Sequence, residues 1–194
     1  MQKILYYFSI LCLLTVFGCK DDETNNPCGE INCQNGGKCE NGICDCPPHF
    51  TGADCGQQIT PIEIRINKIE VIQWPSQTPD GEDWDKGFCI GPLPDIFAIL
   101  RDDQEELLST AFVSESREDS IYTYQDSFPV LTTNISSELN ISLFDRDTGL
   151  CLPSDSMGTV QAPLYFPTND FPSILELSSD DPPIKVKVFV EYEF

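Results

Sequence analysis

The side chains best suited to chemistry lie in two acidic stretches of the sequence. Asp145-Arg146-Asp147 follows an apolar segment, and in an extended chain the side chains of Asp145 and Asp147 point the same way. A second stretch, residues 74–94, holds several aspartates, and Asp95 opens the apolar segment after it. Calcium takes roughly six to eight hard oxygen ligands in flexible geometry, and carboxylates supply them. The sequence therefore predicts a calcium site if both stretches lie at one end of a fold.

The overall charge leaves a second interpretation of these loops open. The chain of 194 residues has a net charge of −21, so aspartates would be frequent in its loops without any metal. However, two unit charges about 5 Å apart at an effective dielectric near 20 repel by roughly 3 kcal/mol, so carboxylates gathered on one rim would favour a cation or a proton. The same charge argues against nucleic acid or a bare anionic membrane as a direct partner. Solvated acidic loops remain the alternative.

The first 18 residues have the features of a processing segment. Lys3 precedes an apolar run from Ile4 to Phe17, which is too short to span a membrane but suits a signal peptide. The end of this run, Val16-Phe17-Gly18-Cys19, resembles a lipobox, which implies cleavage before Cys19 and lipid on its thiol. The acidic tether 19–27 begins Lys20-Asp21-Asp22-Glu23, similar to the surface-export signal of Bacteroidetes lipoproteins. We therefore expect acyl chains on Cys19 to hold the protein in the outer membrane, exposed on the cell surface. An ordinary signal peptide and a plain solvated tether are the alternatives.

Six of the ten cysteines crowd into residues 28–55. A module this short cannot bury an adequate core, so in an exported chain disulfides are expected to replace it. Spacing alone leaves 15 possible pairings. The segment Cys33-Gln34-Asn35-Gly36-Gly37-Lys38-Cys39, followed by Cys44-Asp45-Cys46-Pro47 and Phe50-Thr51-Gly52-Ala53-Asp54-Cys55, closely resembles an EGF-like domain over residues 28–56. This resemblance implies the pairs Cys28–Cys39, Cys33–Cys44 and Cys46–Cys55. Asn25-Asn26-Pro27 departs from the calcium-binding form of that domain, so we interpret the module as a spacer or protein-contact unit.

Residues 60–194 show alternating apolar and polar segments separated by turns rich in proline. Ile62-Glu63-Ile64-Arg65-Ile66 and Ile184-Lys185-Val186-Lys187-Val188 alternate as half-buried strands do. Further strands are expected near 95–101, 106–113, 128–133, 139–145, 158–164 and 172–177. Eight strands in this length predict a mainly β fold, an eight-stranded antiparallel β-sandwich of two packed sheets.

Several motifs of this second part resemble a C2 domain, a sandwich that binds phospholipid in a calcium-dependent way. They are Asp95-Ile96-Phe97-Ala98-Ile99, Phe128-Pro129-Val130, and Leu143-Phe144-Asp145-Arg146-Asp147 with Asp155-Ser156-Met157-Gly158. The resemblance is dilute, and the last motif is its best part. It implies the calcium ligands Asp85, Asp95, Asp145, Asp147 and Asp155, although the first loop is longer than usual and the third has two extra residues.

Cys89 lies in the first acidic loop, residues 74–94, and Cys151 lies in the third loop, between Asp147 and Asp155. In the predicted sandwich both occupy one rim, so we expect a Cys89–Cys151 disulfide that joins the acidic loops. By the loop-closure estimate, such a bridge stabilises by roughly 4 kcal/mol. Unpaired thiols or links to other chains are the alternative.

The function expected from these features is binding rather than catalysis. We expect a cell-surface lipoprotein that acts as a calcium-dependent binding or adhesion module for a lipid, a glycan or a protein. A structural subunit that calcium merely stabilises is the second hypothesis, and a hydrolase using paired carboxylates is the third. The sandwich contains no histidine, no nucleophile elbow and no phosphate-binding glycine loop, so we do not expect an enzyme.

Overall fold

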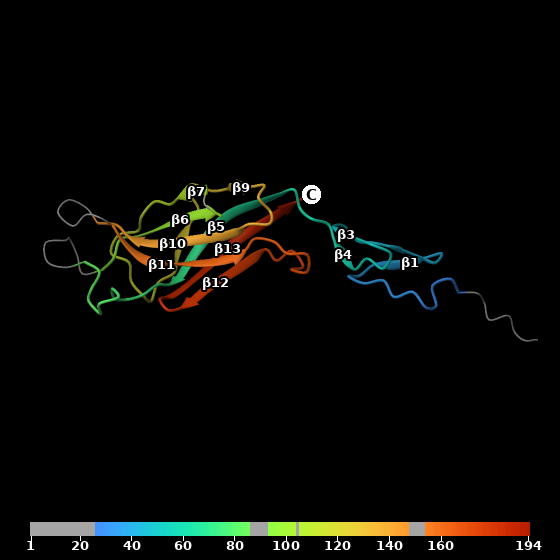
Figure 1. Ribbon diagram of the computed structural model, residues 1–194, viewed down its shortest axis with the longest axis horizontal. Helices are drawn as coiled ribbons and strands as arrows, with labels where there is room; N and C mark the ends of the chain where they lie inside the picture. Colours follow the sequence, from blue (N-terminus) through green and yellow to red (C-terminus); the bar gives the residue numbers. More distant parts are fainter. Residues whose placement is uncertain (1–25, 86–92, 104, 148–153) are drawn as a thin grey trace, which may run out of the picture. The chain divides into compact units, whose positions relative to one another are not determined.

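The computed structural model describes residues 26–85, 93–103, 105–147 and 154–194. The chain divides into two compact units, Met1–Gln57 and Gln58–Phe194 (Figure 1). Every regular element in these ranges is a β-strand. Accordingly, no helix within them is long and apolar enough to cross a membrane.

The first unit is built from short hairpins and disulfides. β1 (Lys38–Glu40) pairs with β2 (Ile43–Asp45), and β3 (Phe50–Thr51) pairs with β4 (Gln57–Gln58). The three bridges are Cys28–Cys39, Cys33–Cys44 and Cys46–Cys55, the pairing that the EGF-like resemblance implied. Cys55 is fully buried, and a Cβ on Gly37 would lie 2.7 Å from its Sγ. Covalent links and one close backbone approach therefore replace an apolar core here.

The second unit is a sandwich of two antiparallel sheets. The four-stranded sheet has the order β11-β10-β6-β7, and the other has the order β12-β13-β5-β8, with β9 also paired to β5. The strands are β5 (Glu63–Gln73), β6 (Ile96–Asp102), β7 (Glu105–Ser109), β8 (Tyr122–Tyr124), β9 (Val130–Thr132), β10 (Glu138–Asp145), β11 (Asp155–Pro163), β12 (Ile174–Asp180) and β13 (Pro183–Glu193).

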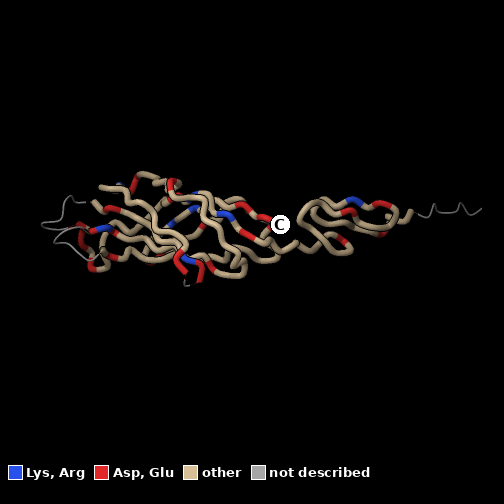
Figure 2. Tube along the Cα trace, turned by 90° about the horizontal axis from the view of Figure 1, so that it is seen from above, with Lys and Arg blue, Asp and Glu red and all other residues tan. Residues whose placement is uncertain are grey.

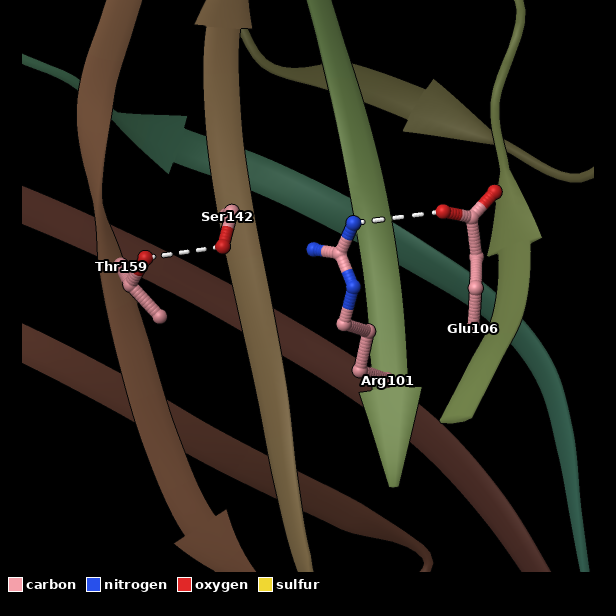
Figure 3. Close-up of polar contacts among 4 residues, drawn as sticks. All are labelled: Arg101, Glu106, Ser142 and Thr159. Carbon is pink, nitrogen blue, oxygen red and sulfur yellow. Dashed lines mark hydrogen bonds and ion pairs between the residues drawn. The ribbon is translucent and has the colours of Figure 1, made fainter. Parts of the chain in front are cut away.

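The core lies between the sheets because apolar residues alternate with polar ones along each long strand. Leu139, Ile141 and Leu143 of β10 are fully buried. The residues between them face outward, where Ser142 and Thr159 share a hydrogen bond of 2.8 Å and Arg101 pairs with Glu106 at 3.2 Å (Figure 3). The pattern of period two thus fixes which face of each sheet packs and which meets water.

The predicted fold class is confirmed, with one difference at the sheet edge next to β5. The structure has two short strands there, because β8 pairs with Ile69–Val71 and β9 pairs with Ile64–Ile66. Both run antiparallel to β5, and residues 125–129 interrupt what would otherwise be one strand. The predicted strand 128–133 corresponds to β9, whereas β8 is an addition that the sequence did not predict. The sandwich therefore has eight strand positions and nine strands.

Strand directions determine which loops share an end of the sandwich. β5 and β10 both finish at the end where β6, β8, β11 and β13 begin. The described connections at this end are residues 74–85, 93–95, 110–121, 146–147, 154 and 181–182, and we call it the acidic end. Figure 2 shows Asp and Glu at this end and also along the rest of the sandwich. The chain enters β5 at the other end of the sandwich.

Candidate cation site at the acidic end

The two acidic stretches meet through a reciprocal pair of hydrogen bonds. The backbone N–H of Asp95 donates to Oδ1 of Asp145 at 2.8 Å, and the N–H of Arg146 donates to the carbonyl of Asp95 at 2.9 Å. Asp95 directly precedes β6 and Asp145 ends β10, strands that pair side by side. Sheet pairing therefore brings the two aspartates together, as the sequence predicted.

Three carboxylates converge beside this junction. One carboxylate oxygen each from Asp85, Asp145 and Asp147 lies within 4.8 Å of the other two. Asp145 is fully buried and Asp147 is 8% exposed. Arg146, between them, is exposed, and its guanidinium lies 4.0 Å from the centroid of the Phe112 ring. The alternation of side chains that the sequence predicted thus places Asp145 and Asp147 on one side of the chain and Arg146 on the other.

Asp145 has one oxygen with no partner. Its Oδ1 accepts the hydrogen bond from Asp95, but its Oδ2 is buried and has no hydrogen-bond partner among the described residues. A buried polar atom left without a partner is normally destabilising by about 1–3 kcal/mol, and more for a charged group. This atom and its two neighbouring carboxylates form a set of hard oxygen donors that fits a cation such as calcium.

Burial and mutual repulsion raise the pKa values of all three carboxyl groups. Burial raises the pKa of Asp85 to about 7, and the charges of Asp145, Asp147, Asp95 and Glu115 add to this effect. Burial likewise raises the pKa of Asp145 to about 6, although the hydrogen bond from Asp95 opposes the shift. The pKa of Asp147 is raised by burial and then by Asp155 and Asp95. Negative charge is therefore disfavoured here unless a cation is bound.

The position of Asp85 follows from the tryptophan before it. Trp84 is 7% exposed, and its Nε1 donates a hydrogen bond of 2.8 Å to the carbonyl of Pro75. Backbone hydrogen bonds between Thr78 and Glu82, and between Gly81 and Thr78, close the intervening turn. The described part of the first loop, residues 74–85, is thus folded back onto the sandwich, which brings Asp85 to the end of β10.

The remaining two predicted ligands lie at the edge of the cluster. Asp155 is paired with Asp145 across β10 and β11 but is itself exposed. Oδ1 of Asp95 accepts a hydrogen bond from the N–H of Glu115 at 2.8 Å. The structure therefore gathers Asp85, Asp145 and Asp147 as the central group and places Asp95 and Asp155 around it.

Glu115 is an acidic neighbour that the sequence did not single out. It has a positive φ of 53° and belongs to the loop after β7, which a bridge between Ile96 and Val113 holds beside β6. It is connected to the site by its hydrogen bond to Asp95 and by its charge, which helps to raise the pKa of Asp85. No local pattern in the sequence could have indicated that position.

Some predicted sites lie outside the described residues. Cys19, Cys89 and Cys151 are among them, so the lipidation and the Cys89–Cys151 disulfide stay predictions.

Comparisons with known proteins show that the first unit is similar to EGF-like domains. The family model for the EGF-like domain matches residues 19–55. Gigasin-2 of Magallana gigas is 41% identical over 64 residues, which are 32% of this chain and 18% of that protein. The match thus spans less than a fifth of the length of that relative.

Solved structures resemble the chain over about two thirds of its length. A structure of a C2 domain has a TM-score of 0.47 and 11% identity, and the match covers 68% of this chain and 98% of that one. Human GIVD cytosolic phospholipase A2 in complex with methyl gamma-linolenyl fluorophosphonate has a TM-score of 0.43 and 13% identity, with coverage of 68% and 17%. A structure of extended-synaptotagmin 2 with its SMP domain and two C2 domains has a TM-score of 0.41 and 18% identity, with coverage of 72% and 29%. At these identities the likeness concerns the fold alone.

Proposed function

We propose that this chain is a cell-surface lipoprotein whose sandwich binds an external ligand, a lipid, glycan or protein, in a calcium-dependent way. The observation that carries the proposal is the buried, unpartnered Oδ2 of Asp145 beside the carboxylates of Asp85 and Asp147. Calcium bound there would satisfy that oxygen and offset the repulsion between the three groups. Its remaining coordination positions would be open to water or ligand.

The proposed attachment is through lipid on Cys19, with the acyl chains in the outer membrane. The tether and the EGF-like unit then act as a spacer between this anchor and the sandwich. This arrangement is supported within the second unit by its topology, because β5 begins at the end opposite the acidic loops. The site would thus be carried at the end of the sandwich away from its point of attachment.

The carboxylates are proposed to act as metal ligands rather than as catalytic acids. A catalytic pair needs one carboxyl group to remain free to exchange protons with a substrate. Here all three carboxylates of the central group are near enough to share one cation, and the sandwich contains no histidine.

Calcium titration of the full chain tests the proposal. We expect a saturable heat of binding by calorimetry and a higher melting temperature in millimolar calcium, because a ligand that binds only the folded state stabilises it. A chelator should reverse both effects. If calcium raises the melting temperature while no lipid, glycan or protein binds, the chain is a structural subunit instead. Incorporation of labelled palmitate, lost in Cys19→Ala, tests the anchor separately.

A further inference from the structure

A cavity of about 370 Å³ opens at the acidic end of the sandwich. Its walls come from the first loop, the start of β11 and the turn between β12 and β13. The lining includes Pro75, Pro79, Trp84, Met157, Pro182 and Pro183 as apolar residues. Gln77, Thr78, Ser156 and Asp181 add polar groups to it.

The cavity shares its framework with the cation cluster. Trp84 lines the cavity and Asp85, the next residue, belongs to the cluster. Ser156 lines the cavity and follows Asp155, whose strand partner is Asp145. The cavity and the cation ligands are therefore carried by the same elements, the first loop and the β10–β11 pair.

Gly158 lines the cavity and lies close to side chains of the turn between β12 and β13 and of the start of β13. Gly158 has a φ of 129°, and a Cβ there would come within 2.4 Å of Cγ of Pro182 and 2.9 Å of Cδ1 of Ile184. The register of β11 shifts next to this glycine, and Met157 turns into the core with 2% exposure. The side of the cavity formed by Met157 and Gly158 is thus closely packed.

The charge of the acidic end indicates which ligands it accepts. The described residues of this end and of the strand ends beside it, 74–85, 93–95, 110–121, 145–147, 154–155 and 180–183, hold 13 acidic and two basic residues. Even two or three divalent cations would leave this end negative. An anionic ligand such as a phosphate headgroup would meet repulsion, whereas neutral hydroxyl groups would not.

The lining of the cavity adds a second requirement. Apolar walls with a few polar groups suit a compact ligand that has one apolar face and several hydrogen-bonding groups, and the volume is near the lower limit for small-molecule sites, about 300 Å³. A sugar ring has this character, with C–H groups on its faces and hydroxyl groups at its rim. Two neighbouring hydroxyl groups supply hard oxygens of the kind calcium takes.

We propose that this cavity binds the ring of a neutral sugar, whose adjacent hydroxyl groups complete the coordination of the cation held by Asp85, Asp145 and Asp147. The inference rests on the proposed function, since it needs a bound cation. It narrows the ligand class to neutral glycans.

The test uses the full chain, millimolar calcium and the methyl glycosides of mannose, galactose, fucose, glucose and N-acetylglucosamine. We compare Gln77→Trp, which fills the cavity from its exposed rim, with Ser76→Trp, a neighbouring exposed residue outside the lining. Saturation-transfer NMR and calorimetry measure sugar binding, and the calcium-induced rise in melting temperature is measured in parallel. Vesicles of phosphatidylcholine and phosphatidylserine serve as the anionic probe.

We expect at least one glycoside to bind in calcium and not in chelator. Gln77→Trp should weaken that binding at least about tenfold, Ser76→Trp should retain it, and all three proteins should show the same calcium-induced rise. Calcium stabilisation without binding of any glycoside would overturn the sugar inference and leave the calcium site standing. Absence of calcium stabilisation would overturn both proposals. Calcium-dependent vesicle binding without glycoside binding, or unchanged glycoside binding by Gln77→Trp, would also overturn the inference.

Discussion

The backbone N–H of Asp95 donates a hydrogen bond to the carboxylate of Asp145, 50 residues further along the chain. One carboxylate oxygen is therefore used to join the two acidic loops, and the other is left for a ligand. The loops meet through this bond and through the pairing of β6 with β10, neither of which involves a metal. Calcium would thus bind to an end of the sandwich that is already assembled.

The Asp145→Asn variant distinguishes the two roles of this residue, which are to accept the hydrogen bond from Asp95 and to bind calcium. The amide oxygen can still accept the hydrogen bond from Asp95, while the negative charge is lost. Since that charge repels its neighbours in the metal-free protein, we expect the metal-free melting temperature to be unchanged or higher. Calcium affinity should fall at least about tenfold, because a full unit of charge beside the cation is removed. Differential scanning calorimetry with and without calcium measures both quantities.

Asp80→Asn is the matched control, because Asp80 is exposed in the first loop and outside the central group. It should leave the calcium-induced shift unchanged. An equal loss of calcium affinity in both variants would show that general surface charge, and not the cluster, attracts the ion.

Calcium affinity should increase with pH over the range set by the raised pKa values. Folding raises the pKa of Asp85 from 3.8 to about 7 and that of Asp145 to about 6, mainly through burial. Raised pKa values mean that these groups contribute to the stability of the metal-free fold below the unfolded pKa, and that this contribution is lost as pH rises through the folded pKa. Protons therefore compete with calcium at mildly acidic pH. Calorimetric titrations from about pH 5.5 to about pH 7.5 should show steadily tighter binding. An affinity that does not change across this range would contradict the assignment of these ligands.

Trp84→Phe should weaken calcium binding from a distance. The change removes the hydrogen bond to Pro75 and part of the packing that positions the loop, so we expect a loss of about 0.5–1.5 kcal/mol in unfolding free energy, together with lower calcium affinity. Trp74→Phe is the control, because Trp74 is also buried but packs against Tyr122 and does not adjoin a ligand. It should reduce stability without reducing calcium affinity. The same affinity for Trp84→Phe as for the unmodified chain would show that Asp85 is positioned by something else.

Gly158→Ala should destabilise the sandwich and distort the cavity. The added Cβ would overlap Pro182 and Ile184, so the turn between β12 and β13 must shift, which we expect to lower unfolding free energy by about 1–3 kcal/mol. Gly81→Ala is the control, since Gly81 also has a positive φ, of 76°, but nothing lies within 4 Å of the added atom. The loss of unfolding free energy in Gly81→Ala should be smaller, because only backbone strain contributes to it. Urea unfolding of both variants compares them, and equal losses would mean that the contact with Pro182 is not tight.

The long strands were largely predictable because their alternation is strong, but their ends were not. β5 and β13 each extend to 11 residues, well beyond the predicted alternating segments. Register shifts at Lys185/Val186 and Phe189/Val190 interrupt the period of two along this pair. The segment predicted as 106–113 ends at Ser109, since Val113 contributes only an isolated bridge to Ile96. β8 has three residues, too few for a periodic pattern.

The central site was predictable where ligands sit at strand ends and not where loops position them. Asp145 and Asp147 follow directly from the alternation of β10. The placement of Asp85 depends on a buried indole and a turn, which propensity and spacing do not encode. Glu115 approaches through the side chain of Asp95, a tertiary contact that only the folded chain reveals.

The most direct measurement is a crystal structure of the sandwich grown or soaked with calcium. We predict one strong density peak within about 2.3–2.6 Å of carboxylate oxygens from Asp85, Asp145 and Asp147, with Oδ2 of Asp145 among them. No peak at the acidic end in saturating calcium, or a cation held elsewhere while Oδ2 of Asp145 keeps no partner, would contradict this account.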